Sequence, residues 1–390
     1  MAETPTIVLG VPRETHAGET RVALVPAVIS LLSKSGVRVV VERGAGVSAG
    51  YPDHLYEEKG ATLGSRDDVF AADIVAHVRV AGANPGHDDR SRLRRDQIVI
   101  GMADPLNEPE AIRDFASTGA TLFALELIPR ITRGQSMDVL SSMATIAGYK
   151  AVLMAADALP RMFPMMMTAA GTVAPARAFI IGAGVAGLQA IASAKRMGAV
   201  VHAYDVRPAV KEQIQSLGAK FVELPVEAGH AEDKGGYARE LGEDFYRRQR
   251  ELMAKVVAES DVVITTAAIP GKKAPVLITG DMLKAMAAGS VIVDLAAERG
   301  GNVDVTRAGE TVEVHGVKVL GPMNLAATVP YHASQMYARN VTAFVQNFVK
   351  KGVINLSTED EIVRDTMVTR GGDVVNAALR ERLGMAVAAQ

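Results

Sequence analysis

The 390-residue sequence contains no cysteine and no tryptophan. Without cysteine, the chain has no disulfides, no thiolate metal ligands and no cysteine nucleophile. Neither sign of charge is in excess, because 42 Lys and Arg balance 44 Asp and Glu. Since proteins that bind nucleic acids usually carry a basic excess, we expect no nucleic-acid partner.

The sequence also shows little that would direct it to or through a membrane. Its first residues contain no basic segment followed by an apolar segment, as a secretory signal would. One uncharged run, Ala178–Ala194, has 17 residues, which is at the lower end of the range that crosses a bilayer. Three glycines among its first ten residues favour a strand, a turn and a helix over a membrane span.

What is present is a globular composition, with 48% hydrophobic residues and a length that predicts two domains. Short β-branched runs alternate with helical patterns in both halves, which is typical of parallel strands joined by crossover helices. The expected strands of the first half are Thr6–Gly10, Val37–Glu42, Ile74–Val80, Gln97–Met102 and Thr121–Glu126. Those of the second half are Ala178–Ile181, Ala199–Asp205, Lys220–Leu224, Asp261–Thr266, Val291–Leu295 and Val317–Leu320. The predicted fold class is α/β, with two Rossmann-like domains built on parallel sheets.

Four further segments have distinct compositions. Met137–Leu159 predicts a long, mostly apolar helix, and Tyr331–Phe348 predicts an amphipathic helix that can return to pack on the first domain. Glu240–Arg250 is compatible with a solvated helix that follows a polar loop. Three consecutive methionines within Pro160–Pro175 are expected to fill a core or an interface rather than to bind a metal.

A glycine motif is the strongest local signal. Gly182, Gly184 and Gly187 form GxGxxG between an expected strand and an expected helix, and Asp205 ends the next strand 23 residues after Gly182. The glycines allow a tight turn, close approach of a pyrophosphate and close helix–strand packing, while the helix N-terminus attracts the phosphates. Asp205 can bind an adenosine ribose and repel a 2′-phosphate, which favours NAD(H), although Arg207 lies nearby. The same turn also occurs in Rossmann-like folds that bind no ligand.

A second glycine cluster, Gly44–Gly50, has the wrong spacing for this motif and is expected to be a loop.

A polar segment before the long helix offers a cation, an amide and a carboxylate at Arg130, Gln135 and Asp138. Such a set can hold the carboxamide and ribose of a nicotinamide nucleotide at the carboxyl edge of a sheet. Asp138 can equally cap the following helix. The eight histidines show no zinc-ligand spacing, so we expect no metal site.

Longer segments allow a comparison with a known family. They are GVPRET, ETRVALVP, PRITRGQSMDVLSS, FPMMMTAAGTVAPAR, GAGVAGLQAIASAKRMGAVV, DVRPAVKEQ, GGYA, ITTAAIPGKKAPVLIT, VDLAAERGGN and VTRGGDVV. On these segments the chain resembles the NAD(H)-binding component of proton-translocating NAD(P) transhydrogenase, the alpha subunit or its first part. The resemblance extends over essentially the whole chain.

This resemblance implies a fold of the alanine dehydrogenase/transhydrogenase domain I type. Residues 1–138 and 329–390 would form one domain, and residues 139–328 the NAD(H)-binding domain. It implies direct hydride transfer between the nicotinamide of NAD(H) and that of NADP(H) bound on a partner subunit, coupled to proton translocation through a membrane-spanning subunit. The chain would be a cytoplasmic homodimer, peripheral to the inner face of the cell membrane and in contact with it only through these partners.

The resemblance also implies roles for individual residues. The nicotinamide site would comprise Arg130, Gln135, Asp138 and Ser141. The residues that bind the rest of NAD(H) would be Gly182, Ala183, Gly184, Val185, Gly187, Asp205, Val206, Arg207, Gly236, Tyr237, Thr266, Ala267 and Ala268. The chain departs from the transhydrogenase pattern at Gly321–Thr328, where many relatives have Pro-Ser-Arg, so no role is assigned within that loop.

Alanine dehydrogenase, which has a similar fold and N-terminal motif, is the main alternative. Its substrate-binding arginine matches Arg21, while its catalytic lysine, histidine and aspartate fall at Arg79, near Asp104 and at Glu298. Oxidation of an amino acid needs a proton acceptor, and an arginine stays protonated. Direct transfer between two nicotinamides needs orientation instead. A non-catalytic NAD(H) sensor is a further alternative.

Overall fold

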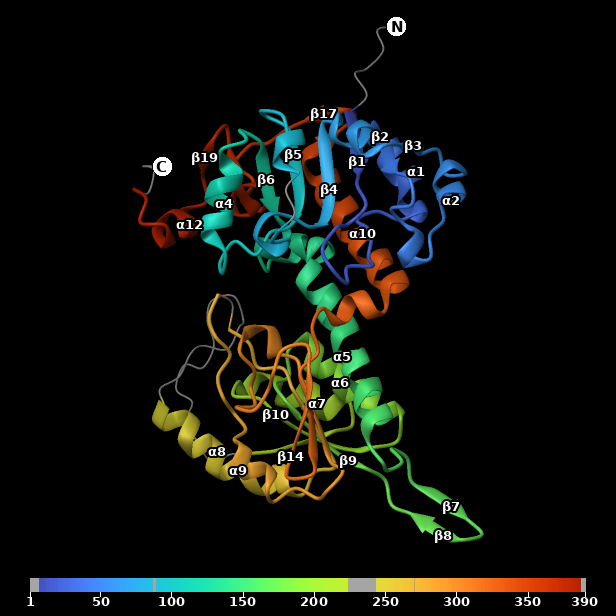
Figure 1. Cartoon of the computed structure of the whole chain (residues 1–390), viewed down its shortest axis with the longest axis vertical. Helices are drawn as coiled ribbons and strands as arrows, with labels where there is room; N and C mark the ends of the chain where they lie inside the picture. Colours follow the sequence, from blue (N-terminus) through green and yellow to red (C-terminus); the bar gives the residue numbers. More distant parts are fainter. Residues whose placement is uncertain (1–6, 87–88, 224–242, 270, 387–390) are drawn as a thin grey trace, which may run out of the picture. The chain divides into compact units, whose positions relative to one another are not determined.

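The computed structural model describes residues 7–86, 89–223, 243–269 and 271–386. The chain divides into two compact units. Unit 1 comprises Met1–Met143 and Ala327–Gln390, and unit 2 comprises Ala144–Ala326. Each unit contains one large sheet flanked by helices, so the predicted α/β fold class is confirmed (Figure 1).

The sheet of unit 1 has the strand order β19-β18-β6-β5-β4-β1-β2-β3. The pairs from β6 to β3 are parallel, and β18 joins β6 in antiparallel orientation. The central strands β1, β4 and β5 are mostly apolar and buried, which is typical of parallel strands covered by helices on both faces. Their bounds are β1 Ile7–Val11, β2 Val37–Glu42, β3 Thr62–Gly64, β4 Ile74–Arg79, β5 Ile98–Met102, β6 Thr121–Ala124, β18 Met367–Arg370 and β19 Asp373–Val374.

The helices of unit 1 are α1 Pro26–Lys34, α2 Asp53–Glu57, α3 Arg66–Phe70, α4 Pro109–Ala116, α10 Pro330–Phe348, α11 Glu361–Thr366 and α12 Ala377–Arg382. Three of them begin with proline, whose fixed φ suits the first helical position. Helix α10 returns to this unit as expected, and its Phe344 and Phe348 contact the ring of Phe123 on β6. Residues more than 200 positions apart therefore share one core.

The sheet of unit 2 has the strand order β11-β10-β9-β12-β13-β15-β14, with only β14 antiparallel. Its strands are β9 Arg177–Ile181, β10 Val200–Tyr204, β11 Lys220–Phe221, β12 Val262–Thr265, β13 Val291–Asp294, β14 Thr311–Val314 and β15 Val317–Leu320. Its helices are α5 Val139–Ala158, which begins in unit 1, α6 Val185–Arg196, α7 Lys211–Ser216, α8 Glu243–Ala258 and α9 Gly280–Leu283. The order reverses between β9 and β12, and this is where open α/β sheets bind ligands.

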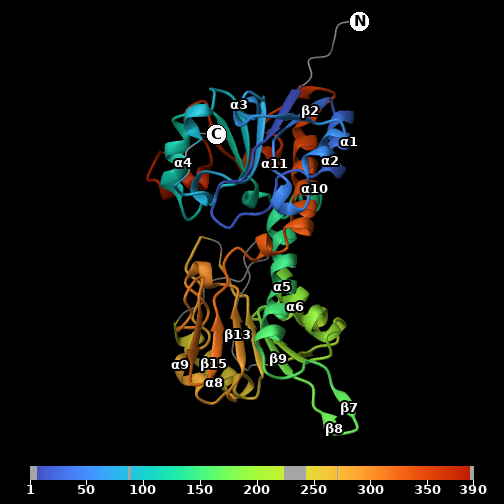
Figure 2. The ribbon, with the colours of Figure 1, turned by 45° about the vertical axis from the view of Figure 1, so that its right-hand side comes forward.

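Alternating residues of β9 divide the core of unit 2 into two layers. Ala178 and Ile180 pack with α5 and α6 on one face, whereas Phe179 and Ile181 pack with α8 and α9 on the other (Figure 2). The strand, turn and helix predicted for Ala178–Ala194 are confirmed. Among the described residues, α5 is the one helix long and apolar enough to cross a membrane. Three of its side chains lie in the core of unit 2, as in the core helix of a globular domain.

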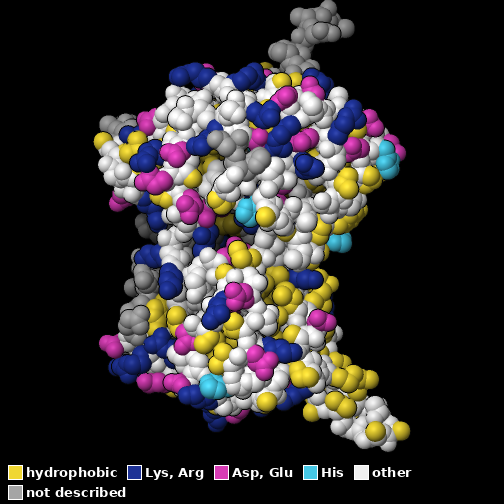
Figure 3. All heavy atoms as spheres, in the orientation of Figure 1, with side chains coloured by type: hydrophobic (Ala, Val, Ile, Leu, Met, Phe, Trp, Pro, Cys, Tyr) yellow, Lys and Arg dark blue, Asp and Glu magenta, His cyan; other side chains and the backbone are white. Residues whose placement is uncertain are grey.

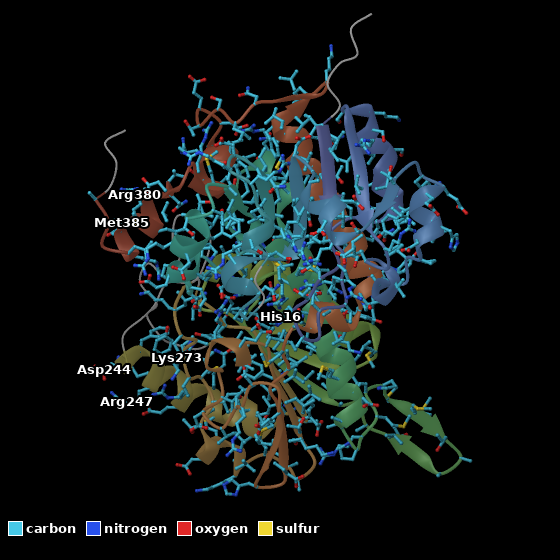
Figure 4. The ribbon with its side chains drawn as sticks, turned by 45° about the horizontal axis from the view of Figure 1, so that its top comes forward. His16, Asp244, Arg247, Lys273, Arg380 and Met385 are labelled. Carbon is cyan, nitrogen blue, oxygen red and sulfur yellow. The ribbon has the colours of Figure 1, made fainter. Side chains whose placement is uncertain are left out.

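Helix α8 confirms the predicted solvated helix and extends it to Ala258. Asp244 and Arg247 form an exposed ion pair in its first turn, where Figure 4 labels both side chains. Met253 and Val257 on the opposite side are buried against the sheet. The helix is therefore amphipathic rather than fully solvated. The polar loop expected before it lies largely outside the described residues.

The methionine segment forms a hairpin of β7 Met166–Thr168 and β8 Gly171–Val173. All six strand residues are exposed, and Met167 reaches 80%. The alternative that the three methionines fill the chain's own core is wrong, because the hairpin packs no side chain into either sheet's core, whereas the interface alternative stays a prediction. Figure 3 shows the hydrophobic side chains along this projecting hairpin. A second small sheet pairs β16 Val349–Lys350 with β17 Val353–Ile354.

Candidate functional site

The glycine turn connects β9 to α6 at the point where the strand order reverses. Gly182 has a φ of +95°, a conformation that glycine adopts without strain. A Cβ on Gly187 would lie 1.9 Å from the carbonyl oxygen of Gly182, so the helix approaches the strand too closely for any side chain. A Cβ on Gly184 would meet nothing within 4 Å. Each glycine has the backbone geometry that its expected role requires.

The N-terminus of α6 offers backbone donors to a ligand. Gly184 is its N-cap residue and makes no side-chain cap. The 12-residue helix therefore presents its first N–H groups and the positive end of its dipole beside the free space at Gly184. This combination is the one that binds phosphate groups in Rossmann folds.

Asp205 follows β10 and is 8% exposed. Its Oδ2 accepts the backbone N–H of Ala183 at 2.7 Å, which joins the carboxylate directly to the glycine turn. Arg207 donates from its backbone N and Nε to Oδ1, and from Nη2 to Oδ2, at 2.8–3.0 Å. Four donors thus approach a carboxylate that has about four acceptor positions. The sequence showed that Arg207 lies near Asp205, but it did not predict these hydrogen bonds. A ribose at Asp205 therefore has to share the carboxylate with Arg207 or replace its hydrogen bonds.

The segment after β12 lies against the same turn. Thr266 donates its backbone N–H to Ile181 at 2.8 Å and its hydroxyl to the carbonyl of Gly182 at 3.1 Å. The peptide groups of Ala267 are bonded to the side chain of Asn302, a residue that the sequence analysis missed. Ala268 is exposed. The structure therefore brings Gly182, Asp205 and Thr266 to one edge of the sheet of unit 2, while Gly236 and Tyr237 lie outside the described residues.

The predicted nicotinamide segment belongs to unit 1. Arg130 and Gln135 are both exposed, and Gln135 lies in the short 3₁₀ helix η5, Thr132–Met137. Asp138 precedes α5 and accepts the backbone N–H of Ser141 at 2.9 Å and its hydroxyl at 2.6 Å. The capping role that the sequence left open for Asp138 is thus observed, and Ser141 is its partner.

Two contacts from the C-terminal segment of unit 1 hold this loop. Arg133 forms a bidentate pair with Asp360 near the start of α11, and Asn340 on α10 donates to the carbonyl of Ser136 at 2.8 Å. The Arg133 hydrogen bonds lower the pKa of Asp360 to about 2. The loop that carries Arg130 and Gln135 is thereby fixed on both sides of Gly134.

The residues that the sequence aligns with an alanine dehydrogenase site, Arg21, Arg79 and Asp104, donate hydrogen bonds to the carboxylates of Glu19 and Glu126. Glu19 accepts hydrogen bonds from Arg21 and from Arg79, at 2.6–2.7 Å and 3.0 Å respectively, and its side chain is fully buried. Asp104 lies in a turn with φ of +51°, where its backbone N–H donates to Glu126. Neither Glu19 nor Glu126 was predicted. Arg79, Ala103 and Asp104 reach them through tertiary contacts, whereas Arg21 lies only two residues from Glu19 in the sequence.

Glu126 is a buried carboxyl group that holds this turn. Its Oε1 accepts from the backbone N–H groups of Ala103 at 2.8 Å and Asp104 at 2.6 Å. Its Oε2 is buried without a hydrogen-bond partner among the described residues. Burial raises the pKa of Glu126 to about 7, against the lowering effect of these backbone donors. A protonated carboxyl is consistent with this environment, because an unpaired buried carboxylate oxygen is costly.

The remaining expectations concern loops and metals. Gly44–Gly50 forms the predicted loop, in which Gly44 donates its N–H to Asp53 at 2.9 Å and a short 3₁₀ helix spans Val47–Ala49. In the Gly321–Thr328 loop, Asn324 donates its backbone N–H to Glu298. Within the described residues of the chain, no three metal-ligating side chains cluster.

Comparison with known proteins gives matches over nearly the whole chain. The family model "Alanine dehydrogenase/PNT, N-terminal domain" matches residues 10–147, and the model "Alanine dehydrogenase/PNT, C-terminal domain" matches residues 151–377. The first part of the NAD(P) transhydrogenase alpha subunit of Rhodospirillum rubrum is 45% identical over 377 residues, covering 95% of this chain and 98% of that protein.

Two further relatives separate the two branches of this similarity. The crystal structure of transhydrogenase from Sinorhizobium meliloti superposes with a TM-score of 0.82 at 44% identity, covering 95% of this chain and 99% of the other. Alanine dehydrogenase of Bacillus subtilis is 28% identical over 388 residues, covering 97% of this chain and 95% of that enzyme. The chain is thus more similar in sequence to these transhydrogenases than to this alanine dehydrogenase.

Proposed function

Because the chain belongs to the alanine dehydrogenase/PNT family, as its sequence motifs predicted, we propose that it is the NAD(H)-binding subunit of a proton-translocating transhydrogenase. The family implies an oxidoreductase role with a nicotinamide nucleotide. The finer assignment rests on the 40–45% identity to transhydrogenase alpha subunits over about 95% of the chain. The observation that carries the nucleotide site is the glycine turn with free space at Gly184.

The residues of unit 2 fit an NAD(H) ligand. The N–H groups at the start of α6 bind the pyrophosphate, and the missing side chain at Gly184 lets it approach. Asp205 binds the adenosine ribose and repels a 2′-phosphate. As the ribose enters, its hydroxyl groups replace hydrogen bonds that Arg207 donates to Asp205. The remaining residues of the proposed NAD(H) site are Ala183, Val185, Gly187, Val206, Gly236, Tyr237, Thr266, Ala267 and Ala268.

The chemistry that we propose requires little from the protein beyond orientation. The bound nicotinamide supplies or accepts the hydride. Arg130 and Gln135 bind the carboxamide end through their exposed polar groups, while Asp138 fixes Ser141 at the start of α5. Positioning of two reactants can contribute a large share of catalysis without a general acid or base. The division into domains of residues 1–138 with 329–390, and 139–328, is part of this proposal.

The proposed partners follow from the names of the relatives. A protein whose name makes it the first part of an alpha subunit belongs to a larger assembly. We propose that an NADP(H)-binding subunit and a membrane-spanning subunit complete the cycle, and that the chain works as a cytoplasmic homodimer on the inner face of the membrane. The reaction is then direct hydride transfer between NAD(H) on this chain and NADP(H) on the partner, coupled to proton translocation.

The decisive experiment mixes the purified chain with an NADP(H)-binding transhydrogenase component. We expect hydride exchange between a nicotinamide analogue and NADPH, and loss of exchange in Gln135→Ala with NADH binding retained. Arg113→Ala, an exposed change on α4, is the control that keeps full exchange. Tight NADH binding without exchange in the wild-type mixture would contradict the proposal and favour a sensor.

Alanine dehydrogenase is the second candidate, because an enzyme of that name matches the chain over almost its full length. The catalytic lysine of that enzyme aligns with Arg79 of this chain, and its catalytic histidine aligns near Asp104. Arg79 cannot act as a base at accessible pH. We therefore expect no NADH formation from alanine and NAD⁺ at alkaline pH. Robust turnover in that assay would replace the transhydrogenase assignment.

A further inference from the structure

A buried carboxylate organises the end of β13 in unit 2. Asp294 is fully buried, and its Oδ1 accepts from the hydroxyl of Thr265 and the backbone N–H of Ala296, both at 3.0 Å. Its Oδ2 accepts from the N–H groups of Asn302 at 2.7 Å and Val303 at 3.1 Å, and from the hydroxyl of Thr306 at 2.7 Å. These five donors carry no charge. They are backbone and hydroxyl groups from four points of the following loop and from the neighbouring strand.

The loop is built to close around this carboxylate. Gly300 and Gly301 have φ values of +94° and +80°, so the chain turns back within two residues. A Cβ on Gly301 would lie 2.8 Å from Oδ2 of Asp294. The turn delivers Asn302 to a fixed place in which its backbone carbonyl accepts from Leu277 and Ile278 at 2.8 and 3.0 Å.

The side chain of Asn302 then binds both backbone polar groups of Ala267 at the cofactor edge. Its Oδ1 accepts the N–H of Ala267 at 3.1 Å, and its Nδ2 donates to the carbonyl of Ala267 at 2.9 Å. Nδ2 also donates to the carbonyl of Pro275 at 2.9 Å. Both polar groups of Ala267 are therefore bound by one buried amide, as in a strand pair. Since Thr266 bonds to Gly182, Asn302 sets the backbone next to the glycine turn.

The strand order determines which part of a dinucleotide lies there. Asp205 follows β10 on one side of the glycine turn, while Ala267 follows β12 and Asp294 ends β13 on the other side. A ligand with its pyrophosphate at the turn and its adenosine at Asp205 must direct its nicotinamide half toward β12. The contact with Ala267 therefore concerns this half and not the adenosine half.

From this geometry we propose that Asn302, held in place by Asp294, is a positioning residue for the nicotinamide half of the nucleotide. This inference rests on the proposed function. Asn302 acts through the backbone of Ala267 and need not touch the ligand. Asp294 acts one step further away, by fixing the turn that presents Asn302.

The test compares the affinities of two ligands for the full chain. NADH occupies both halves of the site, whereas ADP occupies the adenosine and phosphate part alone. In Asn302→Ala we expect the dissociation constant for NADH to rise about tenfold, and that for ADP to change by less than twofold. Ser290→Ala is the matched control, because Ser290 is also fully buried in unit 2, but near the opposite end of β13, and we expect it to leave both constants unchanged.

Hydrogen exchange provides a second measurement that does not depend on any ligand. The amide of Ala267 is expected to exchange faster in Asn302→Ala, while amides in the middle of β12 keep their protection. The inference would be overturned if the substitution left the ratio of the NADH and ADP affinities unchanged, either because neither affinity falls or because both fall equally. An unchanged exchange rate at Ala267 would also overturn it. No NADH binding by the wild-type chain would instead refute the proposed function, and the inference with it.

Discussion

The second and third glycines of the motif, Gly184 and Gly187, are expected to respond differently to the same substitution. In Gly187→Ala the added Cβ would lie 1.9 Å from the carbonyl oxygen of Gly182 and 2.8 Å from its carbonyl carbon. Helix α6 has to move away from β9, at a cost of about 1–3 kcal/mol or more for such overpacking. The higher helix propensity of alanine offsets about 1 kcal/mol of this. We expect a clear net loss in the free energy of unfolding.

In Gly184→Ala the same methyl group enters free space. The residue has φ −72° and ψ −169°, a conformation open to alanine, and nothing lies within 4 Å of the added Cβ. Replacing glycine by alanine at an N-cap lowers the free energy of unfolding by about 0.5–1 kcal/mol. The reduced conformational freedom of the unfolded chain raises it by about 0.4–1 kcal/mol. Stability should therefore stay within about 1 kcal/mol of the wild type. The methyl group occupies the approach of the pyrophosphate, so NADH affinity should fall more than tenfold.

Urea titration followed by circular dichroism measures the stabilities, through shifts in the unfolding midpoint. NADH fluorescence measures binding, and the absence of tryptophan leaves that signal free of indole emission. The reasoning would be refuted if Gly184→Ala unfolded as easily as Gly187→Ala. Wild-type NADH affinity in Gly184→Ala would refute the assignment of the free space to a phosphate.

Three further predictions concern titration and specificity. Burial raises the folded-state pKa of Glu126 from 4.5 to about 7, so its contribution to stability is complete below pH about 4.5 and is lost as the pH rises through 7. The loss amounts to as much as about 3 kcal/mol, Glu126→Gln should remove it, and a parallel pH profile of urea midpoints for both proteins would contradict the assignment. The Arg133 pair lowers the pKa of Asp360 to about 2, so its contribution is present above pH about 4 and lost as the pH falls through 2. Asp360→Asn should flatten the acid-unfolding curve in that range, and an unchanged curve would argue against the pair. Asp205→Ala should weaken NADH binding and reduce the preference for NADH over NADPH, which titrations with both nucleotides would test.

The local patterns of the sequence predicted most of the elements that position the site. The β-branched runs indicated the central strands of both sheets, and the glycine spacing predicted the turn at Gly182. The predicted long helix Met137–Leu159 corresponds closely to α5, Val139–Ala158. These features depend on residues within about 20 positions of one another, so a local pattern is sufficient to reveal them.

The features that were missed depend on distant partners. Strand β18 joins the sheet of unit 1 by pairing Met367 with Phe123, and no local pattern near residue 367 encodes that register. The bonds from Asn302 to Ala267 link residues 35 positions apart. The hydrogen bonds from Arg207 to Asp205 and from Arg21 to Glu19 are exceptions, because each pair lies two residues apart and such a local spacing could have indicated it. The exposed methionines were assigned to a core or an interface because apolar composition alone does not show which side chains a fold covers.

The methionine hairpin gives this cysteine-free chain a distinct oxidative chemistry. All its sulfur is in 17 methionines, and Met162, Met165, Met166 and Met167 are 39–80% exposed within one short segment. Since oxidation to the sulfoxide follows exposure, peroxide reaches this segment before the buried thioethers of Met253 and Met367. Each sulfoxide converts an apolar side chain into a polar one, so oxidation makes the surface of this segment more polar while both cores stay intact.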